Sequence, residues 1–274
     1  MNNRSTLGSR LVASPYIVWS VLFIVAPLIF VVYYSFTDAS GAFTLENITA
    51  LSKYAPTFLR SIWFGIVATL ICLVIAFPLA YFISQSTEKV QRTMVMLVML
   101  PMWMSFLIRT YSWMALLQDT GIINSLLGKI GIDPIHMINT EGAVILGMVY
   151  NFLPYMILPI YSVMAKLDHS MVEACQDLGG NRLTVIRRCI IPMSMPGIVS
   201  GITMVFVPSV STFYISQKLG GGSFDLIGDV IERQFQQSYN YNLGASLSLV
   251  LMVLILICMA VMNRFSGDEE GMVI

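Results

Sequence analysis

The chain has 274 residues, of which 57% are hydrophobic and only 11% are charged, and its mean hydropathy is +0.77. Soluble domains carry about 25% charged residues, so this composition excludes a soluble globular protein, whose surface it could not cover. The 15 basic and 15 acidic side chains cancel, and the net charge therefore gives no indication of a nucleic-acid partner.

The first apolar run, residues 15–36, follows two arginines, Arg4 and Arg10. A signal peptide begins in the same way, but its apolar region is only about 7–15 residues long. This run is long enough to cross a bilayer. We therefore expect an uncleaved first transmembrane helix.

Six apolar runs are long enough to span a membrane, since a hydrocarbon core about 30 Å thick requires about 20 helical residues. They are 15–36, 60–84, 93–117, 143–166, 190–216 and 244–262. Charged residues lie almost entirely between these runs, and Arg109 is the one placed well inside a run. The sequence predicts an all-α integral membrane protein in which 1–274 form one domain with six transmembrane helices.

Prolines recur within these runs. They are Pro27, Pro78, Pro101, Pro154, Pro159, Pro192, Pro196 and Pro208. Each removes a backbone donor, and such breaks persist in lipid only where protein or a water-filled cavity satisfies the backbone. The pattern favours helices that line a path, although any single proline is also compatible with a kink in a static bundle.

The basic residues between the spans predict the orientation of the chain, because cytoplasmic loops carry an excess of Lys and Arg. With the N-terminus inside, the inner segments hold Arg4, Arg10, Lys89, Arg92, Lys166, Arg182, Arg187, Arg188 and Arg264. The outer segments hold Lys53, Arg60, Lys129, Lys218 and Arg233. The inner set is larger, so we expect both termini in the cytoplasm.

The segment 167–189 is a polar stretch between two apolar spans. Ser170, as the N-cap, and Glu173 have the spacing of a capping box, and the apolar positions from Met171 to Leu178 predict a short helix. Gly179 can end it in a left-handed conformation, and Asn181 can cap a second helix over 182–190. A helix pair of this kind is expected either to fold back on its own bundle or to fit a groove on a cytoplasmic partner.

This segment resembles the EAA motif of ABC-importer permeases, which reads E-A-A-x3-G-x9-I-x-L-P. Glu173, Ala174, Gly179 and Pro192 match, whereas Cys175, Cys189 and Ile191 are small or apolar replacements. The resemblance implies the type I, MetI-like permease fold, with this segment docking into a cleft of an ATPase subunit. The residues expected to make that coupling contact are Met171, Glu173, Ala174, Asp177, Leu178, Gly179 and Arg182.

Four further segments are similar to the permeases of the polyamine branch, which import spermidine and putrescine. They are 101-PMWMSFLIRTYSW-113, 192-PMSMPGI-198, 213-FYISQKLGG-221 and 226-LIGDVI-231. Some relatives carry an acid where this chain has Gln217. The resemblance implies a second permease subunit, an ATPase homodimer, an extracytoplasmic solute-binding protein and a polyamine substrate, with lipid around the spans.

The chain contains no G-x4-G-K-[ST] loop that could cradle the phosphates of a nucleotide. We therefore expect no enzymatic activity or cofactor on this chain, and ATP with Mg²⁺ on a partner ATPase. The four cysteines and two histidines lack metal-ligand spacing, so we also expect no metal. All acidic residues fall in connectors or tails, which disfavours the alternative of an ion-coupled secondary transporter. Another small solute also remains an alternative to polyamines.

Two sets of residues are candidates for contact with the substrate or its binding protein. The translocation path or gate is expected to include Trp103, Arg109, Tyr155, Tyr214 and Ser216. Aromatic rings can hold amines by cation–π contact, although span-end tyrosines are also common interface anchors. Arg109 fits either a structural arginine or a latch to an outer acid. Asp225, Asp229 and Glu232 form a stripe that is expected to be either a solvated face or an acidic mouth.

Overall fold

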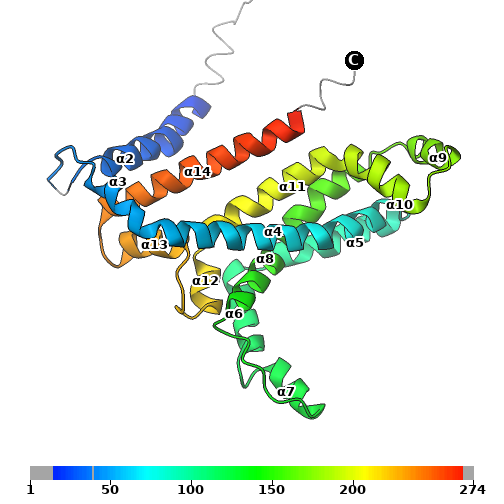
Figure 1. The fold of residues 1–274 in the computed structure, drawn as a ribbon, viewed down its shortest axis with the longest axis horizontal. Coiled ribbons are helices and arrows are strands. Elements are labelled where there is room, and N and C mark those ends of the chain that lie inside the picture. Colours follow the sequence, from blue (N-terminus) through cyan, green and yellow to red (C-terminus); the bar gives the residue numbers. More distant parts are fainter. Residues whose placement is uncertain (1–14, 39, 268–274) are drawn as a thin grey trace, which may run out of the picture. The chain divides into compact units, whose positions relative to one another are not determined.

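The computed structural model describes residues 15–38 and 40–267, which are predominantly helical (Figure 1). Within these residues the only β pairing is an isolated bridge between Thr37 and Phe43. The helices are η1 (Val21–Val25), α2 (Ala26–Ser35), α3 (Glu46–Ala50), η2 (Leu51–Tyr54), α4 (Ala55–Ser84), α5 (Glu88–Trp103), α6 (Phe106–Leu117), α7 (Ile122–Lys129), α8 (Glu141–Met164), α9 (His169–Asp177), α10 (Arg182–Val185), η3 (Ile186–Ile190), α11 (Ile191–Ser211), α12 (Tyr214–Leu219), α13 (Ile227–Gln236) and α14 (Tyr241–Gly267). Arg4 and Arg10, used above for orientation, lie outside the described residues.

Five described helices are long and apolar enough to cross a membrane: Pro15–Ser35, Glu46–Ser84, Glu141–Met164, Arg182–Ser211 and Tyr241–Met262. A sixth crossing is obtained if α5 (Glu88–Trp103) and the segment Phe106–Lys129, which contains α6 and α7, count as one broken span. The run 93–117 is therefore not one straight helix. Its two parts meet at an angle of 89°, with the break at Met104 and Ser105, just after Pro101 in the last turn of α5. In Figure 1, α6 turns away from α5 and carries α7 at its end.

The described chain forms two compact units. One contains the residues up to Ala55 together with Val230–Leu254, and the other contains Pro56–Asp229 together with the residues from Ile255 onward. In the first unit, Asn242 at the start of α14 donates to the carbonyl oxygen of Thr37 at 2.7 Å. Ser246, one turn later, donates to the carbonyl oxygen of Ser35 at 3.1 Å. These bonds hold the end of α2 against α14.

Asp38, just after α2, closes a tight turn in the same unit. Its Oδ1 accepts hydrogen bonds from the hydroxyl of Ser40 at 2.6 Å and from the backbone N–H of Ala42 at 2.9 Å. These bonds, with the Ser40 hydroxyl as the largest cause, lower the pKa of Asp38 below its usual value of 3.8. These bonds and the isolated Thr37–Phe43 bridge together close this turn.

Small residues allow the helices of the second unit to approach closely. Buried side chains on α4 recur at every fourth position through Ala68, Cys72, Ala76 and Ala80, and the Cys72 thiol lies 3.8 Å from the carbonyl oxygen of Val149 on α8. Such spacing places one face of α4 along the bundle. Because lipid chains are as apolar as leucine, van der Waals packing of this kind is what holds membrane helices together.

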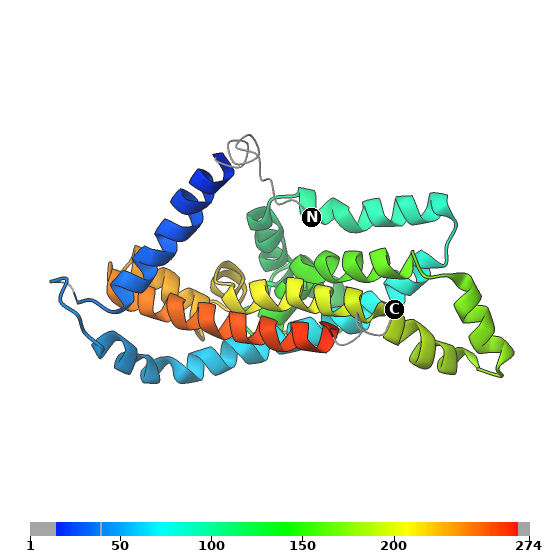
Figure 2. The ribbon, with the colours of Figure 1, turned by 90° about the horizontal axis from the view of Figure 1, so that it is seen from above.

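The most extensive contact between two helices of this unit runs between α8 and α11. A Cβ added at Gly197 would lie 2.8 Å from the carbonyl oxygen of Pro159, and one added at Gly201 would lie 2.7 Å from Sδ of Met156. Two glycines one turn apart therefore allow the backbone of α11 to approach α8. Both figures show α9 and α10 at the end of this pair, where α8 ends and α11 begins (Figures 1 and 2).

Candidate functional site

The helix α9 begins at a different residue from the one that the capping-box pattern predicted. Asp168 is the N-cap, and its carboxylate accepts the backbone N–H of Ser170 at 3.0 Å. The prediction that Ser170 is the cap is therefore wrong. Both residues are good caps, and Asp168 takes the role because α9 begins two residues earlier, at His169. The segment corresponding to the predicted 171–178 helix is His169–Asp177.

The turn after α9 has the predicted geometry. Gly179 has φ of +83°, the left-handed conformation that a side chain disfavours. At the next residue, a Cβ on Gly180 would lie 2.5 Å from the carbonyl oxygen of Cys175. The two glycines thus serve different needs, the first a backbone conformation and the second space for a close backbone approach.

The second helix of the segment is capped as predicted but does not end at Ile190. The side chain of Asn181 accepts the backbone N–H of Thr184 at 2.8 Å. Helix then continues without interruption through a π turn at Ile186–Ile190 into α11. Pro192 lies directly after this π turn, inside the continuous helix Arg182–Ser211, and does not break it.

One side of α9 is anchored to the bundle and the other is exposed. Val172 and Cys175 pack against the buried core, and the thiol of Cys189 lies 3.8 Å from the carbonyl oxygen of Met171. Beyond this contact, Leu178 at the end of α9 is 90% exposed, and Leu183 on α10 is 72% exposed. The expected coupling residues Met171, Glu173, Ala174, Asp177, Leu178, Gly179 and Arg182 are exposed.

Tyr214, a predicted path residue, lies in a cluster of aromatic side chains between α6 and α12. Its ring centroid is 6.2 Å from that of Tyr111 and 5.9 Å from that of Phe106. The Nζ of Lys218 lies 5.5 Å from the centroid of Tyr111 and 5.8 Å from that of Tyr214. The cluster therefore already holds one primary ammonium group by cation–π contact.

Lys218 was counted in the sequence only as an outer basic residue, and its place in this cluster was missed. The signal that could have revealed it is its spacing, since positions four apart share a helix face and Lys218 follows Tyr214 by one turn. Tyr111 comes from a helix more than a hundred positions earlier. Only the packing of α12 on α6 brings it to the same point.

Tyr155, a second predicted path residue, is not part of this cluster. It lines a groove of about 530 Å³ between α8 and α11, with Ser162, Ser200 and Met204 among the other lining residues. The groove lies beside the close contacts of Gly197 and Pro159, and both of these residues also line it. Proline and glycine in these helices thus coincide with a concave surface that carries hydroxyl groups.

Trp103 and Arg109 lie on either side of the break in the third span. Trp103 ends α5 and is 71% exposed, whereas Arg109 on α6 is only 7% exposed. The Nε and Nη1 atoms of Arg109 are buried and have no hydrogen-bond partner among the described residues. An outer acid that would latch Arg109 is therefore not found in the described part of the chain. The structure brings neither residue to the aromatic cluster by a ring or ionic contact.

The predicted acidic stripe does not form one exposed face. Asp225 and Glu232 are half-buried, but Asp229 is only 3% exposed. Its carboxylate accepts the hydroxyl of Ser216 at 2.8 Å and the backbone N–H of Leu226, also at 2.8 Å. Ser216, expected in the path, is itself 1% exposed. The interpretation of Asp229 as a surface charge is therefore wrong, because it caps an internal turn.

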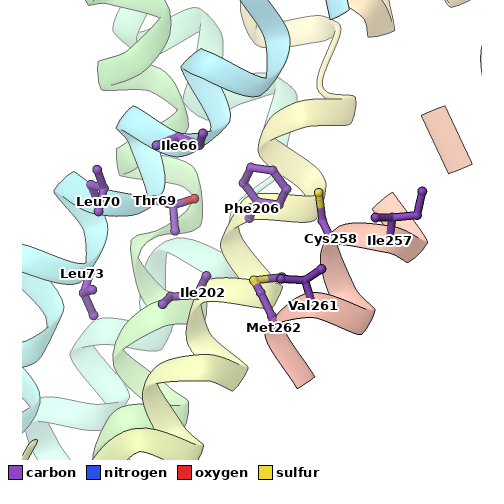
Figure 3. Close-up of a pocket in the computed structure, with 10 residues that line it drawn as sticks. All are labelled: Ile66, Thr69, Leu70, Leu73, Ile202, Phe206, Ile257, Cys258, Val261 and Met262. Atoms are coloured by element: carbon purple, nitrogen blue, oxygen red, sulfur yellow. The ribbon is translucent and has the colours of Figure 1, made fainter. Parts of the chain in front are cut away.

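An apolar pocket of about 340 Å³ was not predicted from the sequence. Ile66, Leu70 and Leu73 of α4 line it together with Phe206 of α11 and Met262 of α14 (Figure 3). Thr69 contributes the hydroxyl seen among these side chains, and this hydroxyl donates to the carbonyl oxygen of Gly65 in its own helix. The other polar side chain among the lining residues is the thiol of Cys258, so the pocket presents no charged group to a solute. Among the described residues, no group of His, Cys, Asp or Glu is arranged to hold a metal ion.

Comparison with known proteins places most of the chain in one family model. The model for the binding-protein-dependent transport system inner membrane component matches residues 3–266. The spermidine/putrescine transport system permease protein PotB of Haemophilus influenzae is 38% identical over 234 residues, 81% of each chain. PotB of Escherichia coli is 38% identical over 227 residues, covering 79% of this chain and 82% of its own.

The fold is also similar to that of a solved transporter. A bacterial alginate ABC transporter, in complex with an alginate pentasaccharide-bound periplasmic protein, contains a chain that superposes with a TM-score of 0.76. The match covers 94% of this chain and 93% of that one, at 18% sequence identity. At 18% sequence identity, this match is evidence for a shared fold and for nothing more.

Proposed function

Because the chain belongs to the family of binding-protein-dependent transport system inner membrane components, we propose that it is a permease subunit of an ATP-driven importer of polyamines. The observation that carries this proposal is the 38% identity to PotB permeases over 81% of each chain. The all-helical ABC-importer permease fold expected from the sequence is confirmed by the superposition on a transporter chain. The chain is thus a multi-pass protein of the inner membrane and a transport component rather than an enzyme.

An importer of this class requires further chains. We propose a second permease that completes the path, two ATPase subunits that hydrolyse ATP with Mg²⁺, and an extracytoplasmic binding protein that delivers the polyamine. The solved alginate transporter, with its substrate-bound periplasmic protein, supports an assembly of this kind. The preferred polyamine would be selected mainly by the binding protein, since a path that releases its cargo must bind it weakly.

The exposed side of α9 is the proposed contact with the ATPase. Leu178 and Leu183 are exposed apolar side chains, and Glu173 is an exposed acidic residue of the same segment. An apolar patch flanked by charge is typical of a protein interface. Because Val172 and Cys175 anchor the other side of α9 to the bundle, displacement of α9 by the ATPase would move α8 and α11.

The aromatic cluster of α6 and α12 is the proposed contact with the polyamine. The rings of Tyr111 and Tyr214 already accommodate the ammonium group of Lys218, and a polyamine carries ammonium groups of the same kind. A cation–π contact contributes about 0.5–1 kcal/mol where it is exposed to water. Such a contact is weak enough for passage. The groove at Tyr155 is the proposed continuation of the path.

We propose an orientation in which both termini and α9 lie in the cytoplasm. In it, α7 and the start of α13 lie on the outer side of the membrane. It rests on the excess of Lys and Arg in the segments assigned to the inside. Asp225 and Glu232, which are half-buried, are proposed to attract cations or the binding protein on the outer side.

Uptake of labelled spermidine into proteoliposomes tests the proposed function. The vesicles contain this chain with its second permease and ATPase, enclose ATP, and receive the binding protein outside. We expect uptake that requires ATP and is abolished by an inactive ATPase. Uptake driven by an ion gradient without ATP would identify a secondary transporter, and ATP-driven uptake of another solute but not of polyamines would refute the substrate assignment.

A further inference from the structure

The connection between α12 and α13 is held by one buried carboxylate. Asp229 accepts the hydroxyl of Ser216 on α12 and the backbone N–H of Leu226, each at 2.8 Å. Ser216 and Leu226 are 1% and 0% exposed. A buried carboxylate needs such donors, because a charge or polar atom taken out of water without them is strongly destabilising. The bonds therefore tie α12 to the start of α13.

The same connection is also fixed to α4 and α11. The backbone N–H of Ile227 donates to Oγ of Ser61 at 2.7 Å, and Ser61 in turn donates to the carbonyl oxygen of Thr57 at 2.9 Å. A Cβ added at Gly228 would lie 2.4 Å from the carbonyl oxygen of Thr212, at the end of α11. The carboxylate of Asp229 thus extends from a backbone that two long helices hold in place.

By contrast, α12 cannot hold its own position. It has six residues, and its N-terminus has no side-chain cap. Helices of this length are not stable alone. Ser216 faces the interior together with Ile215 and Leu219, which pack against Gly147 on α8. The other face of α12 carries Tyr214 and Lys218, so whatever fixes Ser216 also fixes the aromatic cluster.

We propose that Asp229 is a positioning residue, which sets the position of α12, and with it Tyr214 and Lys218, through hydrogen bonds to Ser216 and Leu226. Asp229 acts through these hydrogen bonds and not through attraction between its charge and the transported polyamine. The inference deepens the proposed function and rests on it only for the transport measurement. From the sequence, Ser216 was expected in the translocation path and Asp229 in an acidic mouth. In the structure the two side chains instead bond to each other inside the protein.

Asparagine distinguishes the two roles of Asp229, because it removes the charge but can keep both bonds. Its Oδ1 can accept the N–H of Leu226, and its Nδ2 can donate to Oγ of Ser216. The Ser216 hydroxyl would then donate to the carbonyl oxygen of Phe213, which it already reaches at 2.8 Å. Alanine at position 229 can make neither bond.

The first experiment measures ATP-driven spermidine uptake by the complete transporter over a range of spermidine concentrations. We expect Asp229→Ala to lower the maximal rate about tenfold or more, as loss of two hydrogen bonds to a carboxylate would allow. The half-saturating concentration should not change, because the binding protein sets it. Asp229→Asn should stay within about twofold of the parent. Asp133→Asn, which removes an exposed acid, is the charge control.

The second experiment measures the position of α12 against α8 by disulfide cross-linking, and it does not depend on transport. A Cβ at Gly147 would lie 3.8 Å from Cγ of Leu219, which is the position that a cysteine sulfur would take. In a chain whose four native cysteines are replaced, the pair Gly147→Cys and Leu219→Cys should form a disulfide on oxidation with copper phenanthroline and oxygen. Adding Asp229→Ala should reduce the yield, and adding Asp229→Asn should not.

The outcomes separate the two proposals. An unchanged disulfide yield with Asp229→Ala, or equal loss of transport with Ala and Asn, would overturn the positioning role. A parent transporter that shows the expected disulfide pattern but imports no polyamine would refute the proposed function alone. If Asp229→Ala does not assemble, Ser216→Ala serves in its place, with Ser112→Ala as control, because the Ser112 hydroxyl bonds only its own helix. Ser216→Ala should lower both rate and yield; no change would overturn the role.

Discussion

The carboxylate of Asp168 accepts the backbone N–H of Ser170 at 3.0 Å, and this contact begins α9. Replacing Asp168 with alanine should destabilise the helix by about 1 kcal/mol, as loss of an N-cap does. Ser170→Ala should have little effect. Co-purification of the ATPase with each variant checks the expectation, with a weaker association only for Asp168→Ala. The reverse order would restore Ser170 as the cap.

The left-handed turn at Gly179 gives a second prediction. Its φ is +83°, and no atom lies within 4 Å of a Cβ added there, so a substitution is opposed by backbone strain and not by a clash. Gly179→Val should cost at least about 1 kcal/mol and weaken ATPase association, whereas Gly179→Asn, which tolerates this conformation, should retain most of it. Gly128→Val is the control for an open glycine in an unstrained helix.

Glu173 is exposed on the proposed coupling surface. Glu173→Ala should release the ATPase more readily and stop transport, since breaking a buried interface charge contact costs about 2–5 kcal/mol. Insertion of the chain in the membrane should be unchanged. Membrane fractionation beside transport provides the measurement, with Glu88→Gln as an exposed control on α5. Full transport by Glu173→Ala would exclude this residue from the coupling contact.

The ring of Tyr214 should matter more than its hydroxyl. Tyr214→Phe keeps the ring face that attracts cations, and Tyr214→Leu removes it, so the leucine variant alone should transport spermidine more slowly by roughly two- to fivefold. Phe82→Leu on α4, an exposed aromatic outside the cluster, should have no effect. Equal rates for the leucine and phenylalanine variants would remove Tyr214 from the path.

The proposed orientation is checked with reporter fusions. A fusion after Ser223 should report the outer side and one after Ile274 the cytoplasm, because basic residues retain the inner segments. A cytoplasmic signal at Ser223 would invert the assignment of α9 as the ATPase contact.

The helices themselves could be predicted because a membrane requires long apolar segments whose backbone is satisfied internally. Prolines were less informative, since Pro78 lies inside an uninterrupted α4 whereas Pro101 precedes a bend of 89°. The presence of a proline in an apolar run therefore does not tell whether the helix bends there.

The site was predictable where its determinants are local. Gly179 and Asn181 act on residues within one turn, and both have the expected geometry. The pairing of Asp229 with Ser216 closes a loop of thirteen positions, and the helical pattern of α13 alone placed Asp229 with the surface acids. Tyr111 and Lys218 likewise meet only after α12 packs on α6.

The two glycines that join α8 to α11 have a mechanical consequence. With the backbone of α11 seated against Pro159 and Met156, neither helix can slide or separate without first losing this contact. The two helices should therefore move as one rigid body when the ATPase displaces α9. A small rotation at the end that carries α9 would become a larger displacement at the other end of α8 and α11, about 30 Å away. The helices would tilt without changing length.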